Sequence, residues 1–180
     1  MNNRFINLPN ETSLDVGDPE SMNVCLQVAG KDDLDRVLVY VRAYHEYEGI
    51  AHSADKTASA LRRLLGQGTL GRVWFICLGS QSIGHIAICF GYSIEFSGRD
   101  AVVDEMFIVP EHRGKGFGKT VLALVKSEAA LLGVKALHLE VARSNEGARR
   151  LYRSAGFVSR EQFFVMSVHL ESPAAQQDSG

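Results

Sequence analysis

The segment best suited to chemistry is a glycine-rich, basic run, Arg113-Gly114-Lys115-Gly116-Phe117-Gly118-Lys119. Its three glycines lack a Cβ atom, so the backbone can turn tightly and bring consecutive N–H groups against an anion. The run therefore predicts a cradle for phosphate groups, with Lys115 and Lys119 available to offset their charge.

The residues on either side of this run predict a strand and a helix. Residues 102–109, Val-Val-Asp-Glu-Met-Phe-Ile-Val, have the β-branched and aromatic content of a strand, and Pro110 ends it. Residues 116–132 have apolar residues at helical spacing, and Gly133 can end that helix. A helix that begins in the glycine run adds its unbonded amides and its dipole to the cradle.

Two common phosphate-binding loops do not fit this segment. A Walker A loop ending in Gly118-Lys119-Thr120 requires glycine at position 113, where the chain has arginine. A dinucleotide fingerprint starting at Gly116 requires a third glycine at position 121, where the chain has valine. The spacing that remains is Arg113-x-x-Gly116-x-Gly118.

A second motif follows a predicted strand at residues 136–141. It reads Asn145-Glu146-Gly147-Ala148-Arg149-Arg150-Leu151-Tyr152-Arg153-Ser154-Ala155-Gly156-Phe157 and places Ala148, Leu151 and Tyr152 on one helix face. In the same order along the chain, the two motifs resemble the pyrophosphate signature and the Asn-x-x-Ala-x-x-Leu-Tyr-x-x-x-Gly-Phe segment of the GNAT superfamily, the acetyl-CoA-dependent N-acetyltransferases.

This resemblance implies an α/β fold with a mixed, mostly antiparallel sheet flanked by helices, in which the fourth and fifth strands are a splayed parallel pair. It implies acetyl-CoA as cosubstrate. Pantetheine would bind backbone groups of Met106, Phe107 and Ile108. The pyrophosphate would bind the amides of Arg113, Gly114, Lys115, Gly116, Phe117, Gly118 and Lys119. Asn145 resembles a cofactor contact, and its position also suits the N-cap of its helix.

The implied reaction is direct attack of a primary amine on the thioester in a ternary complex, which needs a base and a proton donor. Tyr152 resembles the donor to the departing sulfur; packing as a core tyrosine is the alternative. Asp104 and Glu105 are the candidate bases, and adjacent strand residues point to opposite faces unless a bulge intervenes. Asp104 resembles the glutamate assigned this role in spermidine/spermine N-acetyltransferases, and Glu105 matches the acidic position of other members. The longer side chain of Glu105 makes it the preferred base.

The acceptor is expected to be a small cationic amine. Glu46 and Glu48 lie among aromatic residues in the segment 44–50, and Glu95 is a further candidate for binding an ammonium group. Residues 111–153 have a formal charge of +5 and the rest of the chain −7, which suits a polyphosphate on one part and a cation on the other. A solvated loop is the alternative for each of these acids.

The remaining pattern predicts one domain over residues 21–171, between a flexible segment at 1–20 and a disordered tail at 172–180. Further strands are expected at residues 22–29, 72–78 and 83–90, helices at 31–48 and 53–66, and a closing strand pair at 157–160 and 163–170.

Composition narrows the functional classes. The net charge of −2 gives no basis for nucleic acid or a membrane as partner. The three cysteines and six histidines lack metal or redox spacing, and no apolar segment reaches membrane-spanning length, so a cytoplasmic protein without a metal is expected. The resemblance also implies a homodimer. One alternative function is a noncatalytic acyl-CoA-binding sensor. Another is a phosphate-transfer enzyme, which the mismatch of Arg113 with the Walker A loop argues against.

Overall fold

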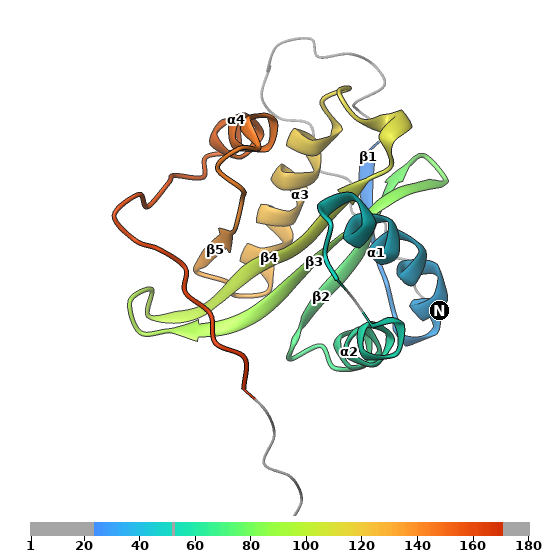
Figure 1. The fold of residues 1–180 in the computed structure, drawn as a ribbon, viewed down its shortest axis with the longest axis horizontal. Helices are drawn as coiled ribbons and strands as arrows, with labels where there is room; N and C mark the ends of the chain where they lie inside the picture. The colour runs from blue at the N-terminus through green and yellow to red at the C-terminus, as the bar shows by residue number, and fades with distance from the viewer. Residues whose placement is uncertain (1–23, 52, 171–180) are drawn as a thin grey trace, which may run out of the picture.

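A computed structural model describes residues 24–51 and 53–170, so the expectations for residues 1–20 and 172–180 lie outside the described residues. One five-stranded sheet has the order β1-β2-β3-β4-β5. The strands are β1 Val24–Val28, β2 Gly71–Leu78, β3 Gln81–Ser93, β4 Gly98–Ile108 and β5 Ala136–Leu139. Strands β1 to β4 are antiparallel and β4 and β5 are parallel, which confirms the α/β fold and the mixed sheet (Figure 1).

Helices cover both faces of the sheet (Figure 1). Helices α1 Leu34–Glu48 and α2 Ala54–Gly66 pack on one face, with Phe75 of β2 in their core. Helix α3 Phe117–Leu131 packs on the other face against Trp74 and Ile76, the neighbours of Phe75. Helix α4 Glu146–Ser154 lies beside α3. No helix in the described ranges has the length and apolar character needed to cross a membrane.

Strand β4 contains one extra residue relative to β3. Ala87 pairs with Glu105, while the next residue, Ile88, pairs with Val103, so Asp104 has no partner of its own. Val103 on one side of this bulge and Met106 on the other both contact the core under α3. Because alternation changes phase at the bulge, Asp104 and Glu105 both lie on the opposite face, the face of α1.

The parallel pair β4 and β5 ends just before the bulge. Its register runs from Asp100 opposite Ala136 to Val103 opposite Leu139. Strand β4 continues to Ile108, whereas β5 stops at Leu139 and its chain turns toward α4 (Figure 1). The two strands therefore part, as the resemblance implied.

The expected closing strand pair is wrong: residues 157–170 form no strand. Phe164, Met166 and Leu170 are 77%, 91% and 88% exposed. The segment is held to the body through an ion pair between Arg160 and Glu95 at 3.1 Å. Its β-branched and aromatic residues suit a pleated, half-buried surface, but a strand also requires a neighbouring edge to complete its hydrogen bonds.

Candidate active site

The glycine run forms the turn between β4 and α3. Gly114 and Gly116 have φ of +75° and +81°, and a Cβ added to either would meet no protein atom within 4 Å. The backbone here is thus open to close approach. Gly116 is also the N-cap of α3, so the first turn of the helix contributes further unbonded amides. This donor set fits a pyrophosphate.

Gly118 has a different role. A Cβ at this position would lie 2.9 Å from Leu151 Cδ2 and 3.5 Å from Met106 Cε. The absence of a side chain therefore allows α3 to approach α4 and β4 closely.

The ends of the glycine run are already bonded. The Arg113 N–H donates to the Pro110 carbonyl at 3.1 Å, and the Lys119 N–H donates to the Gly116 carbonyl at 3.1 Å. The Arg113 side chain donates from Nε to the Ile108 carbonyl at 2.7 Å, and its guanidinium lies 4.2 Å from the Tyr47 ring centroid. Of the seven predicted amides, the five from Gly114 to Gly118 lie between these bonded ends.

The backbone of β4 beyond the bulge has groups without a neighbouring strand on the β5 side. The Val109 N–H donates to the Ile83 carbonyl of the β3 side at 2.9 Å. Backbone groups alternate in direction along an antiparallel strand, so Met106 and Ile108 present theirs away from β3. Phe107 faces β3, and its carbonyl lies where a Cβ on Gly84 would be. Alternation thus separates Phe107 from the other two predicted pantetheine contacts.

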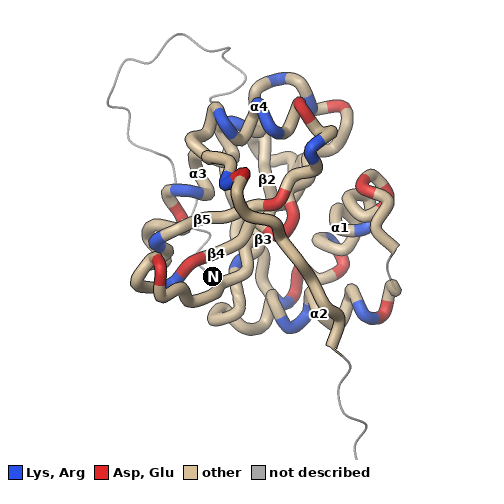
Figure 2. The backbone as a smooth tube through the Cα atoms, turned by 60° about the vertical axis from the view of Figure 1, so that its left-hand side comes forward, with Lys and Arg blue, Asp and Glu red and all other residues tan. Residues whose placement is uncertain are grey.

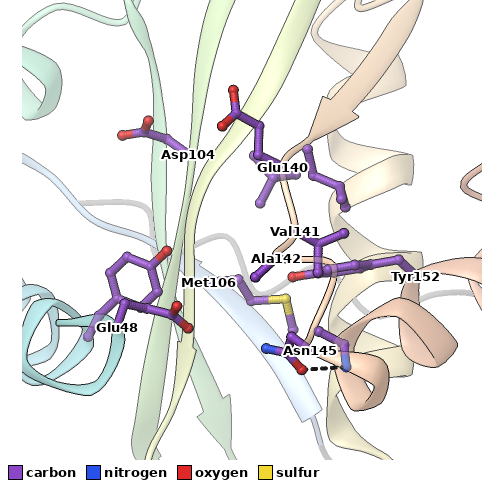
Figure 3. Close-up of a pocket in the computed structure, with 12 residues that line it drawn as sticks. Glu48, Asp104, Met106, Glu140, Val141, Ala142, Asn145 and Tyr152 are labelled. Atoms are coloured by element: carbon purple, nitrogen blue, oxygen red, sulfur yellow. Dashed lines mark hydrogen bonds between the residues drawn. The ribbon is translucent and has the colours of Figure 1, made fainter. Parts of the chain in front are cut away.

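A groove lies where β4 and β5 part (Figure 3). Helix α1, strand β4, the segment after β5 and helix α4 all contribute to its walls. The lining residues are Tyr44, Glu48, Val103, Asp104, Met106, Leu139, Glu140, Val141, Ala142, Asn145, Ala148 and Tyr152. Three of them are carboxylates and none is a lysine, arginine or histidine.

The two candidate bases have different surroundings although both lie on the α1 face. Asp104 borders the groove, whereas Glu105 accepts hydrogen bonds through both of its oxygens. His45 Nε2 lies 2.8 Å from Glu105 Oε1, and His85 Nε2 lies 2.8 Å from Oε2. The His85 side chain is 1% exposed and that of Glu105 16%.

These surroundings move the two carboxyl pKa values in opposite directions. Burial raises the pKa of Glu105, but the hydrogen bonds and charges of His85 and His45 outweigh it and lower that pKa below its ordinary value. Burial, followed by the negative charge of Glu105, raises the pKa of Asp104. The surroundings therefore strengthen proton binding by Asp104 and weaken proton binding by Glu105, each relative to its ordinary value.

Tyr152 and Asn145 lie on the opposite wall of the groove, and the Tyr152 hydroxyl points into it (Figure 3). Burial and then the charge of Glu48 raise the pKa of Tyr152, so its hydroxyl keeps its proton at neutral pH. Burial and then Glu48 likewise raise the pKa of Tyr44 to about 12. The Asn145 side chain accepts from the Ala148 N–H at 3.0 Å, which confirms the predicted N-cap.

The structure separates the three predicted acceptor residues. Glu48 lines the groove (Figure 3), but Glu46 does not and is exposed. Glu95 is paired with Arg160 at the turn between β3 and β4. Glu140, which sequence reasoning missed, borders the groove beyond the end of β5.

The two histidines bound to Glu105 were also missed. His85 stands among apolar residues of a predicted strand, and a polar residue at an inward position of such a strand is the signal that could have indicated it. His45 is one of six histidines without recognisable spacing, and only the folded chain brings it to β4.

A sheet with a parted parallel pair, a glycine turn before a helix and a tyrosine across the gap define a class of acyl-group transferase. Comparison with protein families matches residues 31–157 to the acetyltransferase (GNAT) family, and the chain belongs to it.

Individual proteins agree with this assignment. The chain is 27% identical over 146 residues to the thialysine N-epsilon-acetyltransferase of Sus scrofa, covering 74% of this chain and 84% of that protein. It is 30% identical over 128 residues to an uncharacterized N-acetyltransferase of Archaeoglobus fulgidus, covering 70% and 87%. The solved integron cassette protein from the Cole Harbour Salt Marsh metagenome superposes with a TM-score of 0.72 at 31% identity, covering 86% and 94%.

Replacing Glu105 by glutamine should destabilise the protein at pH 7 by about 2 kcal/mol, because one histidine loses its acceptor and both lose the charge. Since the folded-state pKa of Glu105 is lowered, its contribution is present above the unfolded value of 4.5 and is lost as pH falls through the folded value. Urea unfolding at pH 7 and at pH 3.5 measures both effects. Glu95→Gln, which removes an exposed ion pair, serves as the control. Equal stability of Glu105→Gln and wild type at pH 7 would contradict the assignment.

Proposed function

We propose that this protein transfers an acetyl group from acetyl-CoA to the primary amine of a small cationic acceptor by direct attack in a ternary complex. The observation that carries the proposal is the groove at the parting of β4 and β5, with Asp104 on one wall and Tyr152 on the other. The glycine turn lies at the start of α3, which packs against both β4 and α4.

Acetyl-CoA supplies the acetyl group as a thioester. The amides from Gly114 to Gly118 would hold its pyrophosphate, with Lys115 and Lys119 nearby in the chain. The backbone groups of Met106 and the N–H of Ile108 are directed away from β3 and would bind the pantetheine arm, while the Ile108 carbonyl accepts from Arg113 Nε. Asn145, which borders the groove, keeps its amide N–H₂ group available after capping α4 through its oxygen.

Asp104 is the base in this proposal. Both oxygens of Glu105 are bonded to histidines, whereas Asp104 borders the groove and has the raised pKa. Asp104 would take the proton that the ammonium must lose before its nitrogen can attack. The Tyr152 hydroxyl would give a proton to the departing thiolate, a role consistent with its raised pKa.

The charge of the groove favours a cationic acceptor. Glu48, Asp104 and Glu140 reach it from three different elements, with no basic side chain among the lining residues. In Figure 2, basic positions gather along α4 and acidic positions mark the strands below it. The relative from Sus scrofa is named for thialysine, a lysine-like amine. Glu48 and Glu140, the two groove carboxylates other than the base, would bind a second ammonium group distant from the reacting nitrogen.

A homodimer and a cytoplasmic location stay predictions. The apolar side chains exposed at Phe164, Met166 and Leu170 provide a surface that a second copy could cover.

The cosubstrate site is tested by binding. CoA and acetyl-CoA should bind in calorimetry more tightly than ATP, and Gly116→Ala should weaken CoA binding at least about tenfold because a Cβ would obstruct the amides. Gly133→Ala is the matched control, since Gly133 also has a positive φ, +79°, but lies at the far end of α3. Equal CoA affinity in folded Gly116→Ala and Gly133→Ala proteins would remove the cradle assignment.

Turnover tests the roles of Asp104 and Tyr152. Thiol release from acetyl-CoA with a panel of amines should detect acetylation by the wild type. Asp104→Asn and Tyr152→Phe should each lower kcat by about 10² or more, the range for lost acid–base help, with CoA affinity unchanged. Wild-type kcat in Tyr152→Phe would make this tyrosine structural. CoA binding without turnover for any amine would favour the noncatalytic sensor.

The charge of the acceptor is tested by comparing monoamines with diamines. Glu48→Gln and Glu140→Gln should raise KM for diamines more than for monoamines, because each removes a partner for the second ammonium. Added salt should shrink the difference, since exposed charges are screened within about 8 Å at physiological ionic strength. Glu46→Gln, on the same helix as Glu48 but outside the groove, is the control. Rapid turnover of neutral aryl amines by all three variants would contradict a cationic acceptor.

A further inference from the structure

Glu105 connects three elements of the fold. Its carboxylate lies between His45 of α1 and His85 of β3, with both Nε2 to oxygen distances at 2.8 Å. These three residues are named here the His–Glu–His clamp, and its two histidines lie 60 and 20 positions from Glu105 in the sequence. His45 and His85 are 9% and 0% exposed, so both histidines of the clamp are buried, while the Glu105 side chain is 16% exposed.

The hydrogen-bond chemistry gives the clamp a defined direction. A carboxylate can only accept, so both imidazoles present an Nε2–H to it. His85 is in turn held by the Tyr40 ring, stacked at 6.3 Å between centroids and 24° between planes. The Tyr40 hydroxyl donates to the Ser82 carbonyl at 2.8 Å. Glu105 is therefore fixed to the framework of α1 and β3 and cannot turn toward the groove without breaking charge-assisted bonds.

The clamp holds Glu105, which is next to Asp104, the extra residue of β4. Asp104 has no pairing partner on β3, and its face is set only by the phase of the strand around it. A regular strand would place Asp104 and Glu105 on opposite faces, one of them in the apolar core under α3. Bonds from α1 and β3 to Glu105 stabilise the bulged arrangement, in which Asp104 borders the groove.

We propose that His45 and His85 are positioning residues for the acetyl-transfer reaction: by holding Glu105 they maintain the bulge that directs Asp104 into the groove. The inference rests on the proposed function. It assigns a catalytic consequence to two histidines that do not line the groove themselves.

The clamp also contributes to the charge around Asp104. Besides Glu105, Asp104 faces groups on α1, β3, the end of β5 and α4. They are Tyr44, His45, Glu48, Cys89, Glu140 and Tyr152, while His85 acts through its bond to Glu105. Burial and then the negative charge of Glu105 raise the pKa of Asp104, whereas His45 and a hydrogen bond from Cys89 lower it. Changes to the two sides of the clamp should consequently move the Asp104 titration in opposite directions.

The first experiment compares His85→Gln with His85→Leu. Glutamine can place an amide N–H near the position of Nε2, whereas leucine leaves Glu105 Oε2 without its donor. His85→Leu should lower kcat by about 10- to 100-fold with the KM for acetyl-CoA unchanged, and His85→Gln should recover most of it. His138→Leu is the control, because His138 lies in the same sheet but makes its 3.6 Å ion pair with Asp100 rather than with Glu105. Thermal unfolding of each variant sets an assay temperature at which all are folded.

The second experiment measures the titration of Asp104 by carboxyl-carbon NMR and by the acidic limb of the kcat/KM profile. Glu105→Gln should move the Asp104 titration to lower pH, and His45→Gln should move it to higher pH. In the Glu105→Gln background, His85→Leu should cause little further loss of kcat, because the histidine acts through Glu105.

The outcomes separate this inference from the proposed function. Absence of acetylation by the wild type would refute the function, and the NMR titration would still test the clamp. Normal turnover in folded His85→Leu, or an Asp104 titration that moves in neither variant, would overturn the clamp while leaving the acetyltransferase proposal intact. A drop in stability of His85→Leu with unchanged kcat would show that the clamp only holds the fold.

Discussion

The structure of the site depends on one extra residue in β4. Two adjacent carboxylates in a regular strand would point to opposite faces, and one would enter the apolar core that α3 forms with Val103 and Met106. Because Ala87 pairs with Glu105 while Ile88 pairs with Val103, Asp104 is accommodated without a partner. The bulge lets the apolar core continue on one face of β4 and places both acids on the other.

The bulge coincides with the end of the parallel ladder. Pairing between β4 and β5 stops at Val103 and Leu139, and the next residue of β4 is Asp104. A ladder that continued would have used the backbone groups of Met106 and Ile108 in the sheet. Its interruption leaves Met106 beside the groove without a neighbouring strand on that side, while Gly118 lets α3 approach α4 closely.

Neighbouring residues of similar type acquire different properties from their surroundings. Glu105 is buried and hydrogen-bonded by two histidines, which lowers its pKa despite the cost of burial. For Asp104, burial and then the negative charge of Glu105 raise the pKa by more than His45 and the hydrogen bond from Cys89 lower it. The opposite shifts come from burial and from contacts with α1 and β3. This is why the chemical role of each acid follows from the fold, although their identities suggest that the longer glutamate is the better base.

The sequence by itself determined three local features: the glycine turn at Gly114 and Gly116, the start of α3, and the Asn145 cap of α4. Each of them depends on residues only a few positions apart, so local physical chemistry decides it. Alternating and helical patterns also located the five strands and four helices. Residues 157–170 had a strand pattern but form no strand, since composition cannot supply a pairing edge. Only the tertiary structure decided the bulge at Asp104, the entry of Glu140 into the groove and the binding of Glu105 by His45 and His85. These depend on register and on contacts across 20 to 60 residues, where small differences in packing rather than local preferences select the arrangement.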